Sequence, residues 1–125
     1  MMSKYKVRTV IIGLGNIGLG YDLNNNMILS HSKSVYKSKY FEIVAAVDKD
    51  RKKTNKFIKK YKKPAFLSIK RFLEQKIKFD FVIISLNTSD HFNSIKQLLN
   101  VNFKYCLLEK PGGVDFEQFK KILKI

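Results

Sequence analysis

The chain has 125 residues, of which 25 are Lys or Arg and 10 are Asp or Glu, so its formal net charge is +15. That length suits one domain, and 45% hydrophobic with 28% charged residues excludes the disordered, collagen-like and disulfide-scaffold classes. One cysteine and two histidines cannot complete a Cys/His zinc cluster, so we expect no metal site and a cytoplasmic protein. No apolar run approaches the roughly 20 residues that cross a bilayer, so we expect no membrane contact.

Strand and helix patterns alternate along the chain, with short β-branched runs typical of buried strands and apolar residues at helical spacing between them. In the first half of the chain we expect a strand at 7–12, a short helix start near 17, an exposed Asn-rich loop at 24–26, a helix at about 30–38, a strand at 41–47 and a helix at 51–61. In the second half we expect a short strand at 64–66, a helix at about 69–75, a strand at 79–86, a helix after 89–90, a strand at 105–108 and a last helix from 115. The apolar positions of the helix after 89–90 are Phe92, Ile95, Leu98 and Leu99. Ser68, Ser89 or Asp90, and Asp115 are the candidate N-caps. Strands joined by helices need right-handed crossovers. The pattern therefore predicts an α/β fold, a doubly wound parallel sheet that is Rossmann-like and forms a single domain over residues 1–125.

Basic residues are concentrated in one predicted helix. Nine Lys or Arg residues and one acid, Asp50, lie between residues 49 and 63, a pattern that nucleic-acid-binding proteins share. At helical spacing, however, Phe57, Ile58 and Tyr61 form one apolar stripe and the lysines occupy the remaining faces. Lysine is abundant along the whole chain, so we favour a solvated helix face and keep nucleic-acid association as the lesser alternative.

Gly13, Gly15 and Gly18 form a G-x-G-x-x-G pattern directly after the first predicted strand, with Asn16 and Ile17 inside it. In a dinucleotide site the first glycine permits a tight turn, the second lets the backbone approach a pyrophosphate, and the third lets the helix pack on the strand. The helix expected to open here adds unpaired N–H groups and a favourable dipole for the anion. These five residues are cofactor-binding candidates, and a glycine turn without a ligand is the alternative.

An acidic residue, Asp48, ends the second predicted strand. Its carboxylate can accept hydrogen bonds from both ribose hydroxyls of adenosine and would repel a 2′-phosphate, which favours NAD over NADP. Arg51 and Lys52 follow closely and leave NADP as the alternative, so Arg51 is a further cofactor-binding candidate. A turn residue or a helix N-cap is the other interpretation of Asp48.

The fourth and fifth predicted strands end in segments rich in polar residues. In open α/β sheets, ligands bind at the carboxyl ends of the strands, so we take residues from both ends as cofactor-binding candidates. They are Ser85, Leu86, Asn87, His91, Glu109 and Lys110. A structural hydrogen bond at a helix start is the alternative for His91, and His31 is a further candidate for the same cleft.

Together these segments resemble the Gfo/Idh/MocA oxidoreductases, named after glucose-fructose oxidoreductase and inositol dehydrogenase. The resemblance covers nearly the whole chain and rests on the glycine turn, on residues 44–48 with Asp50 and Arg51 behind them, on His91, and on Glu109-Lys110-Pro111. In the family, the loop after the fourth strand usually reads Thr-Pro and then a histidine four residues past the proline. This chain has Leu86-Asn87 in place of Thr-Pro, so the resemblance does not extend to the shape of that loop against the nicotinamide.

The resemblance implies an NAD(P)-dependent oxidoreductase that exchanges hydride between nicotinamide and a sugar-like hydroxyl or ketone, such as a nucleotide-linked sugar in surface polysaccharide synthesis. Lys110 matches the lysine of the family's E-K-P signature, near the nicotinamide and the reacting carbon, and is the catalytic candidate; an ammonium there can stabilise a developing alkoxide. Family members also carry a larger domain with the substrate pocket and much of the oligomer interface, which we expect to be absent from this chain. A non-catalytic dinucleotide-binding or sensing module is the alternative function, and a homo-oligomer would form through the missing domain.

Overall fold

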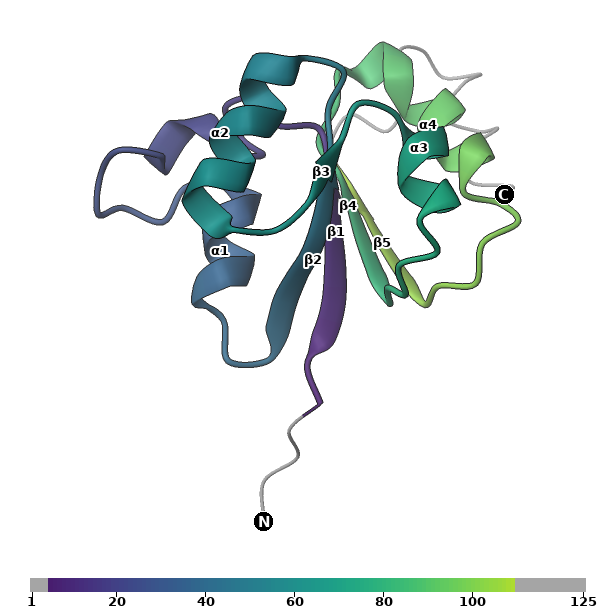
Figure 1. Ribbon diagram of the computed structural model, residues 1–125, viewed down its shortest axis with the longest axis horizontal. Coiled ribbons are helices and arrows are strands. Elements are labelled where there is room, and N and C mark those ends of the chain that lie inside the picture. The colour runs from purple at the N-terminus through teal and green to yellow at the C-terminus, as the bar shows by residue number, and fades with distance from the viewer. Residues whose placement is uncertain (1–4, 110–125) are drawn as a thin grey trace.

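Five parallel strands form one sheet in the computed structural model of the protein, which describes residues 5–109 (Figure 1). They are β1 (Val7–Ile12), β2 (Phe41–Val47), β3 (Ala65–Phe66), β4 (Phe81–Ile84) and β5 (Tyr105–Leu108), in the order β3-β2-β1-β4-β5 across the sheet. The predicted α/β fold with a doubly wound parallel sheet is confirmed. The predicted last helix, Lys110 and Pro111 lie outside the described residues.

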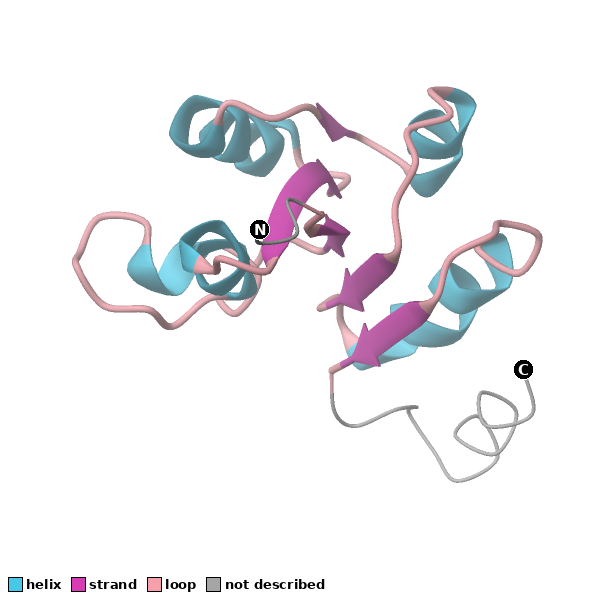
Figure 2. Ribbon diagram, turned by 90° about the horizontal axis from the view of Figure 1, so that it is seen from below, coloured by secondary structure: helices cyan, strands magenta, loops and turns pink. Residues whose placement is uncertain are grey.

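Helices cover both faces of this sheet. The helices α1 (His31–Lys37) and α2 (Arg51–Tyr61) lie on one face, and α3 (Ile69–Glu74) and α4 (His91–Gln97) lie on the other (Figures 1 and 2). Among the described residues, none of the helices is long and apolar enough to cross a membrane.

Alternation along the strands divides the interior into two cores, since successive side chains of a strand point to opposite faces. On the face of α1 and α2, Ile11 packs in one cluster with Val35 and Phe57. On the face of α3 and α4, Ile12 and Phe72 belong to the other cluster. All five side chains are at most 6% exposed, so β1 is buried from both sides and fixes the loop that follows it.

Polar side chains cap most of the helices. Ser30 accepts a hydrogen bond from the amide of Lys33, Asp50 from Lys52, and Ser68 from Arg71, as expected of N-caps. The cap predicted at Ser68 is therefore confirmed. Of the two candidates for α4, Asp90 occupies the N-cap position, but its side chain makes no capping bond within the described residues.

Two apolar positions of the predicted helices face solvent. On α2 the buried face runs through Thr54, Phe57 and Tyr61, while Ile58 lies one step around the helix and is 40% exposed. The helix α4 ends at Gln97, so Leu99 lies beyond its last turn and is 52% exposed. The predicted stripes were therefore one residue too wide in each case.

An inserted segment, residues 20–30, separates the glycine turn from the first helix, α1. It contains the short 3₁₀ helix η1 (Gly20–Asp22). Residues 16–19 form a turn, and the amides of His31 and Ser32 donate to the carbonyls of Ile17 and Gly18, at 2.8 and 3.0 Å. The turn and α1 are thus joined as parts of one helix would be. The helix expected at about 30–38 is therefore confirmed as α1, while the short helix start expected near residue 17 is a turn.

A buried carboxylate holds this insertion. Asp22 is fully buried and accepts hydrogen bonds from the amides of Leu29 and Ser30 and from the Ser30 hydroxyl, at 2.6 to 2.7 Å. Burial alone would raise the pKa of Asp22, but the bonds from Ser30 and Leu29 and the nearby Lys33 ammonium lower it below its usual value. These hydrogen bonds therefore fix the insertion to the start of α1.

Candidate dinucleotide-binding site

The order of the strands creates a crevice at their carboxyl ends. From β1 the chain proceeds outward through β2 to β3, and then crosses back through α3 to β4, which lies on the other side of β1. The strand order therefore reverses between β1 and β4, and ligands of open α/β sheets bind at such a switch point. The glycine turn follows β1 at this point.

Two glycines of the turn are required by the packing of the chain itself. Gly13 has a φ of +103°, and a Cβ there would lie 2.7 Å from the backbone carbonyl of Ser85. A Cβ at Gly18 would lie 2.1 Å from the carbonyl oxygen of Gly13. Both positions exclude any side chain, so these glycines would be needed even without a ligand.

Gly15 differs, because the folded chain gives no reason for a glycine there. Apart from its two chain neighbours, a Cβ at this position would meet no atom of residues 5–109 within 4 Å. The amides of Gly15, Asn16, Ile17 and Gly18 also donate to no acceptor within residues 5–109. Open space beside four unpaired N–H groups is the arrangement that a pyrophosphate requires.

Asp48 lies directly behind this turn. Its Oδ2 accepts a hydrogen bond from the amide of Leu14 and its Oδ1 one from the amide of Asp50, both at 2.8 Å. Asp50, and not Asp48, is the N-cap of α2. Asp48 therefore ties the end of β2 to the glycine turn, and each of its oxygens keeps a lone pair for a further donor.

A cleft of about 290 Å³ opens at the same edge of the sheet, between the end of β2, the start of α3 and the face of α4. Its lining includes Asp48, Leu67, Ser68, Leu86, Asn93 and Gln97. Asp48 and Leu86 are among the site residues predicted from the sequence, whereas Leu67, which directly follows β3, is not. The rule that strand ends gather at one edge would have found it, but β3 has two residues and gives a weak pattern.

The end of β4 braces the turn. The Ser85 hydroxyl donates to the carbonyl of Gly13 at 2.8 Å, and Ser85 is 8% exposed. His91 is 1% exposed, and its Nε2 lies 2.9 Å from the carbonyl of Leu86, so this nitrogen carries the proton and donates it. This geometry favours the structural interpretation of His91, whereas Asn87 is exposed.

The end of β5 reaches the start of α1. The amide of Glu109 donates to the carbonyl of Ile84 at 3.0 Å, and its carboxylate oxygen Oε1 lies 2.6 Å from Nε2 of His31. His31 therefore contacts the residue that precedes Lys110 in the sequence. Arg51 is exposed at the start of α2, two residues beyond the Asp48 turn.

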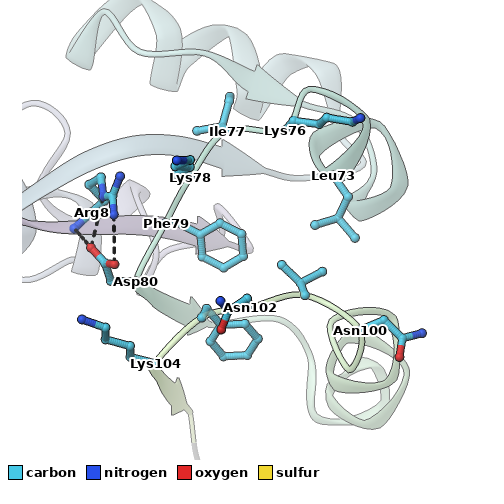
Figure 3. Close-up of a pocket in the computed structure, with 12 residues that line it drawn as sticks. Arg8, Leu73, Lys76, Ile77, Lys78, Phe79, Asp80, Asn100, Asn102 and Lys104 are labelled. Carbon is cyan, nitrogen blue, oxygen red and sulfur yellow. Dashed lines mark hydrogen bonds and ion pairs between the residues drawn. The ribbon is translucent and has the colours of Figure 1, made fainter.

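A larger hollow of about 530 Å³ lies at the opposite, amino-terminal edge of the sheet (Figure 3). Arg8 and Asp80 meet there in a two-pronged ion pair, with Nε–Oδ2 and Nη2–Oδ1 distances of 3.2 Å. The hydrogen bonds from Arg8 and Tyr5 hold the pKa of Asp80 well below its usual range. This pair joins the start of β1 to the start of β4, and the hollow contains no part of the glycine turn.

The sequence matches the family described as an oxidoreductase family with an NAD-binding Rossmann fold, over residues 7–125. The chain belongs to the Gfo/Idh/MocA oxidoreductases. The resemblance inferred from the glycine turn, the strand ends and the E-K-P segment is thereby confirmed. A comparison with curated proteins finds no match.

Solved structures of other dehydrogenases share the fold of this Gfo/Idh/MocA domain. The WlbA dehydrogenase from Chromobacterium violaceum, solved with NADH and UDP-GlcNAcA, is 18% identical with a TM-score of 0.80, and the match covers 99% of this chain and 32% of that chain. The scyllo-inositol dehydrogenase from Lactobacillus casei is 22% identical with a TM-score of 0.77, over 98% of this chain and 33% of that chain. A 3-ketoreductase from Actinomadura kijaniata, solved with NADP, is 18% identical with a TM-score of 0.75, over 96% and 35%. The present chain thus spans about a third of the length of these proteins.

Proposed function

We propose that this chain is the cofactor-binding domain of an oxidoreductase that transfers hydride between NAD and a sugar-like hydroxyl or ketone. The observation that carries the proposal is the glycine turn, where Gly15 faces open space and four successive amides lack an acceptor within the described residues. A phosphate anion can accept hydrogen bonds from such amides, and the partial positive charges of the N–H groups favour its negative charge. The residues present therefore fit the dinucleotide that the family binds.

The proposed cofactor lies across the switch point, with one half on each side of the glycine turn. On the β2 side, Asp48 receives the adenosine ribose, and the cleft lined by Leu67 and Gln97 receives the adenine ring. On the β4 and β5 side, Leu86, Glu109 and Lys110 receive the nicotinamide half.

The nicotinamide supplies the hydride exchange when it is bound. The proposed task of the chain is to orient it and to stabilise charge on the substrate. In this account the Lys110 ammonium donates a hydrogen bond to the substrate oxygen whose charge changes during hydride transfer, and a fixed positive charge lowers the free energy of the alkoxide-like transition state.

The proposed preference for NAD rests on Asp48. A carboxylate that accepts from two ribose hydroxyls loses those bonds and meets a like charge when the 2′-position carries a phosphate. The exposed Arg51 could counter that charge only by turning back toward the strand end. We therefore assign NAD as the cofactor and NADP as the weaker ligand.

The proposed substrate class rests on the structural neighbours of the chain. Its structural neighbours include an inositol dehydrogenase and a dehydrogenase crystallised with a nucleotide-linked sugar acid. Polyhydroxylated rings are common to both, so a sugar-like secondary alcohol or its ketone is the class that we assign to the complete enzyme.

The variant Gly15→Val tests the proposed site. Because no atom of the described residues beyond the two chain neighbours lies within 4 Å of the new Cβ, we expect the thermal unfolding midpoint to stay within about 2 °C, since surface changes usually cost little. NADH affinity, measured by calorimetry, should fall at least tenfold because the side chain occupies the pyrophosphate position. Asn24→Val, in the exposed loop, is the control. Unchanged affinity in Gly15→Val would refute the proposed site.

A further inference from the structure

The contact between His31 and Glu109 joins two segments that lie 78 positions apart in the sequence. His31 is the first residue of α1, and Glu109 directly follows β5. Their side chains are 18% and 30% exposed, and the Nε2–Oε1 distance is 2.6 Å. The helix that continues the glycine turn therefore touches the segment that leads to Lys110.

The backbone of His31 is fixed from both sides. Its amide donates to the carbonyl of Ile17, which lies within the glycine turn. The preceding residue, Ser30, is the N-cap of α1 and is itself held by the buried carboxylate of Asp22. The inserted segment thus delivers the His31 ring to a defined place at the carboxyl edge of the sheet.

Glu109 depends on this contact for the orientation of its side chain. Its amide is bonded to Ile84, which places the backbone. Its carboxylate, however, has His31 as its one hydrogen-bonding partner within residues 5–109, and Oε2 has none there. A partly exposed glutamate without a partner samples several rotamers, and a ligand that needs one of them must overcome the lost side-chain entropy.

We propose that His31 is a positioning residue of the cofactor site. It holds the Glu109 carboxylate so that Oε2 accepts hydrogen bonds from the ribose hydroxyls on the nicotinamide side of the dinucleotide. This inference rests on the proposed function, and it adds to it a residue that acts through Glu109 without touching the cofactor. On the far side of the glycine turn, Asp48 occupies the corresponding place for the adenosine ribose.

A purely structural role makes a different prediction. If the pair only anchors the end of β5 to α1, its loss lowers stability and affects every ligand of the site equally. If His31 positions Glu109, its loss affects only ligands that carry the second ribose. Fragments of the cofactor therefore separate the two roles.

The experiment measures the affinity of the full chain for NADH, ADP-ribose and ADP by calorimetry. NADH and ADP-ribose both carry the second ribose, and ADP does not. The variants are His31→Ala, His31→Gln, Glu109→Gln and the double variant His31→Ala with Glu109→Gln. Ser34→Ala, one turn further along α1 and exposed, is the control.

We expect His31→Ala to weaken NADH and ADP-ribose about tenfold and to leave ADP unchanged. His31→Gln should recover most of the loss, because its amide nitrogen can donate the same bond. In Glu109→Gln the further removal of His31 should have no additional effect, since the two act as a unit. Ser34→Ala should match the wild type.

Equal weakening of all three ligands, or unchanged affinity for all three, would overturn the role of His31 and leave the proposed function standing. A loss in the double variant equal to the sum of two independent losses would also overturn it. A wild-type chain that binds none of the three ligands would instead refute the proposed function, and the inference with it.

Discussion

At the scale of single residues, nearby positions with the same residue type have different roles. Gly13 and Gly18 must be glycines because β1, β4 and the turn approach one another too closely for a side chain. No contact within the described residues requires a glycine at Gly15. Asp48 and Asp50 differ in the same way, since Asp50 caps α2 and Asp48 bonds the glycine turn. The residue without a structural reason, or with spare hydrogen-bonding capacity, is the one to assign to the ligand.

Asp48→Asn tests the cofactor preference. The Asn side-chain oxygen can still accept from the amide of Leu14, but the NH2 group cannot accept from the amide of Asp50, and the negative charge is lost. We expect the ratio of NADH to NADPH affinity to fall about tenfold, mainly through tighter NADPH binding. Asp50→Asn is a matched control, because it removes the same charge two positions away and keeps a capping oxygen. Calorimetric titration with both cofactors measures the ratio. An equal ratio in wild type and Asp48→Asn would show that another residue sets the preference.

At the scale of elements, the insertion at residues 20–30 is the feature that sets this first helix apart. Its polar anchors are buried: Asp22 at 0%, Ser30 at 1% and Lys33 at 7% exposure. Its apolar residues Met27 and Ile28 are, by contrast, more than half exposed. Hydrogen bonds, and not a hydrophobic core, therefore hold this segment in place.

Asp22→Ala should release the insertion. The change removes three hydrogen bonds, two buried and one partly buried, and a buried donor left unpaired costs about 1–3 kcal/mol. We expect the amides of Leu29 and Ser30 to exchange with solvent at least a hundredfold faster, while amides of β1 change much less. Asn25→Ala, in the exposed part of the loop, provides the comparison. Protection that survives in Asp22→Ala would mean that Asp22 does not anchor the segment.

Most elements could be predicted from the sequence, because the strands are short β-branched runs and the helix caps are ordinary Ser and Asp residues. The bounds of β1, β2, β5 and α2 are those expected. The loop at 24–26 and the helix at about 30–38 were also expected, but the hydrogen bonds from His31 to Ile17 and from Ser32 to Gly18 could not be predicted, because they span the loop. The same holds for the His31–Glu109 contact, which depends on how the sheet brings two distant segments together.

At the scale of the whole molecule, the two edges of the sheet have different tasks. At the carboxyl edge lie the glycine turn, Asp48 and Glu109. Within residues 5–109 the amides of the turn have no acceptor, and the two carboxylates can accept further hydrogen bonds. At the amino edge, Asp80 accepts hydrogen bonds from the amide and guanidinium of Arg8 and from the Tyr5 hydroxyl. Ligand binding is therefore expected at one edge and a contribution to fold stability at the other.

The Asp80 pair makes stability depend on pH. The pKa of Asp80 is lower in the folded chain than in the unfolded chain, so the pair stabilises the fold above the unfolded value of about 4. That contribution is lost as the pH falls from about 4 through the folded pKa. We expect Asp80→Asn to lower the urea midpoint at pH 7 and to flatten its decline below pH 4. A variant that declines in parallel with the wild type would show that other carboxylates govern acid unfolding.

The most direct test of the account is to map where NADH binds on the ¹⁵N-labelled chain by amide chemical-shift changes. We expect the largest changes at Gly15, Asn16, Ile17 and Gly18, with smaller ones at Asp48 and Glu109 and none around Asp80 at the amino edge. Changes confined to the amino edge, or no change at millimolar NADH, would contradict the assignment of the glycine turn as the cofactor site.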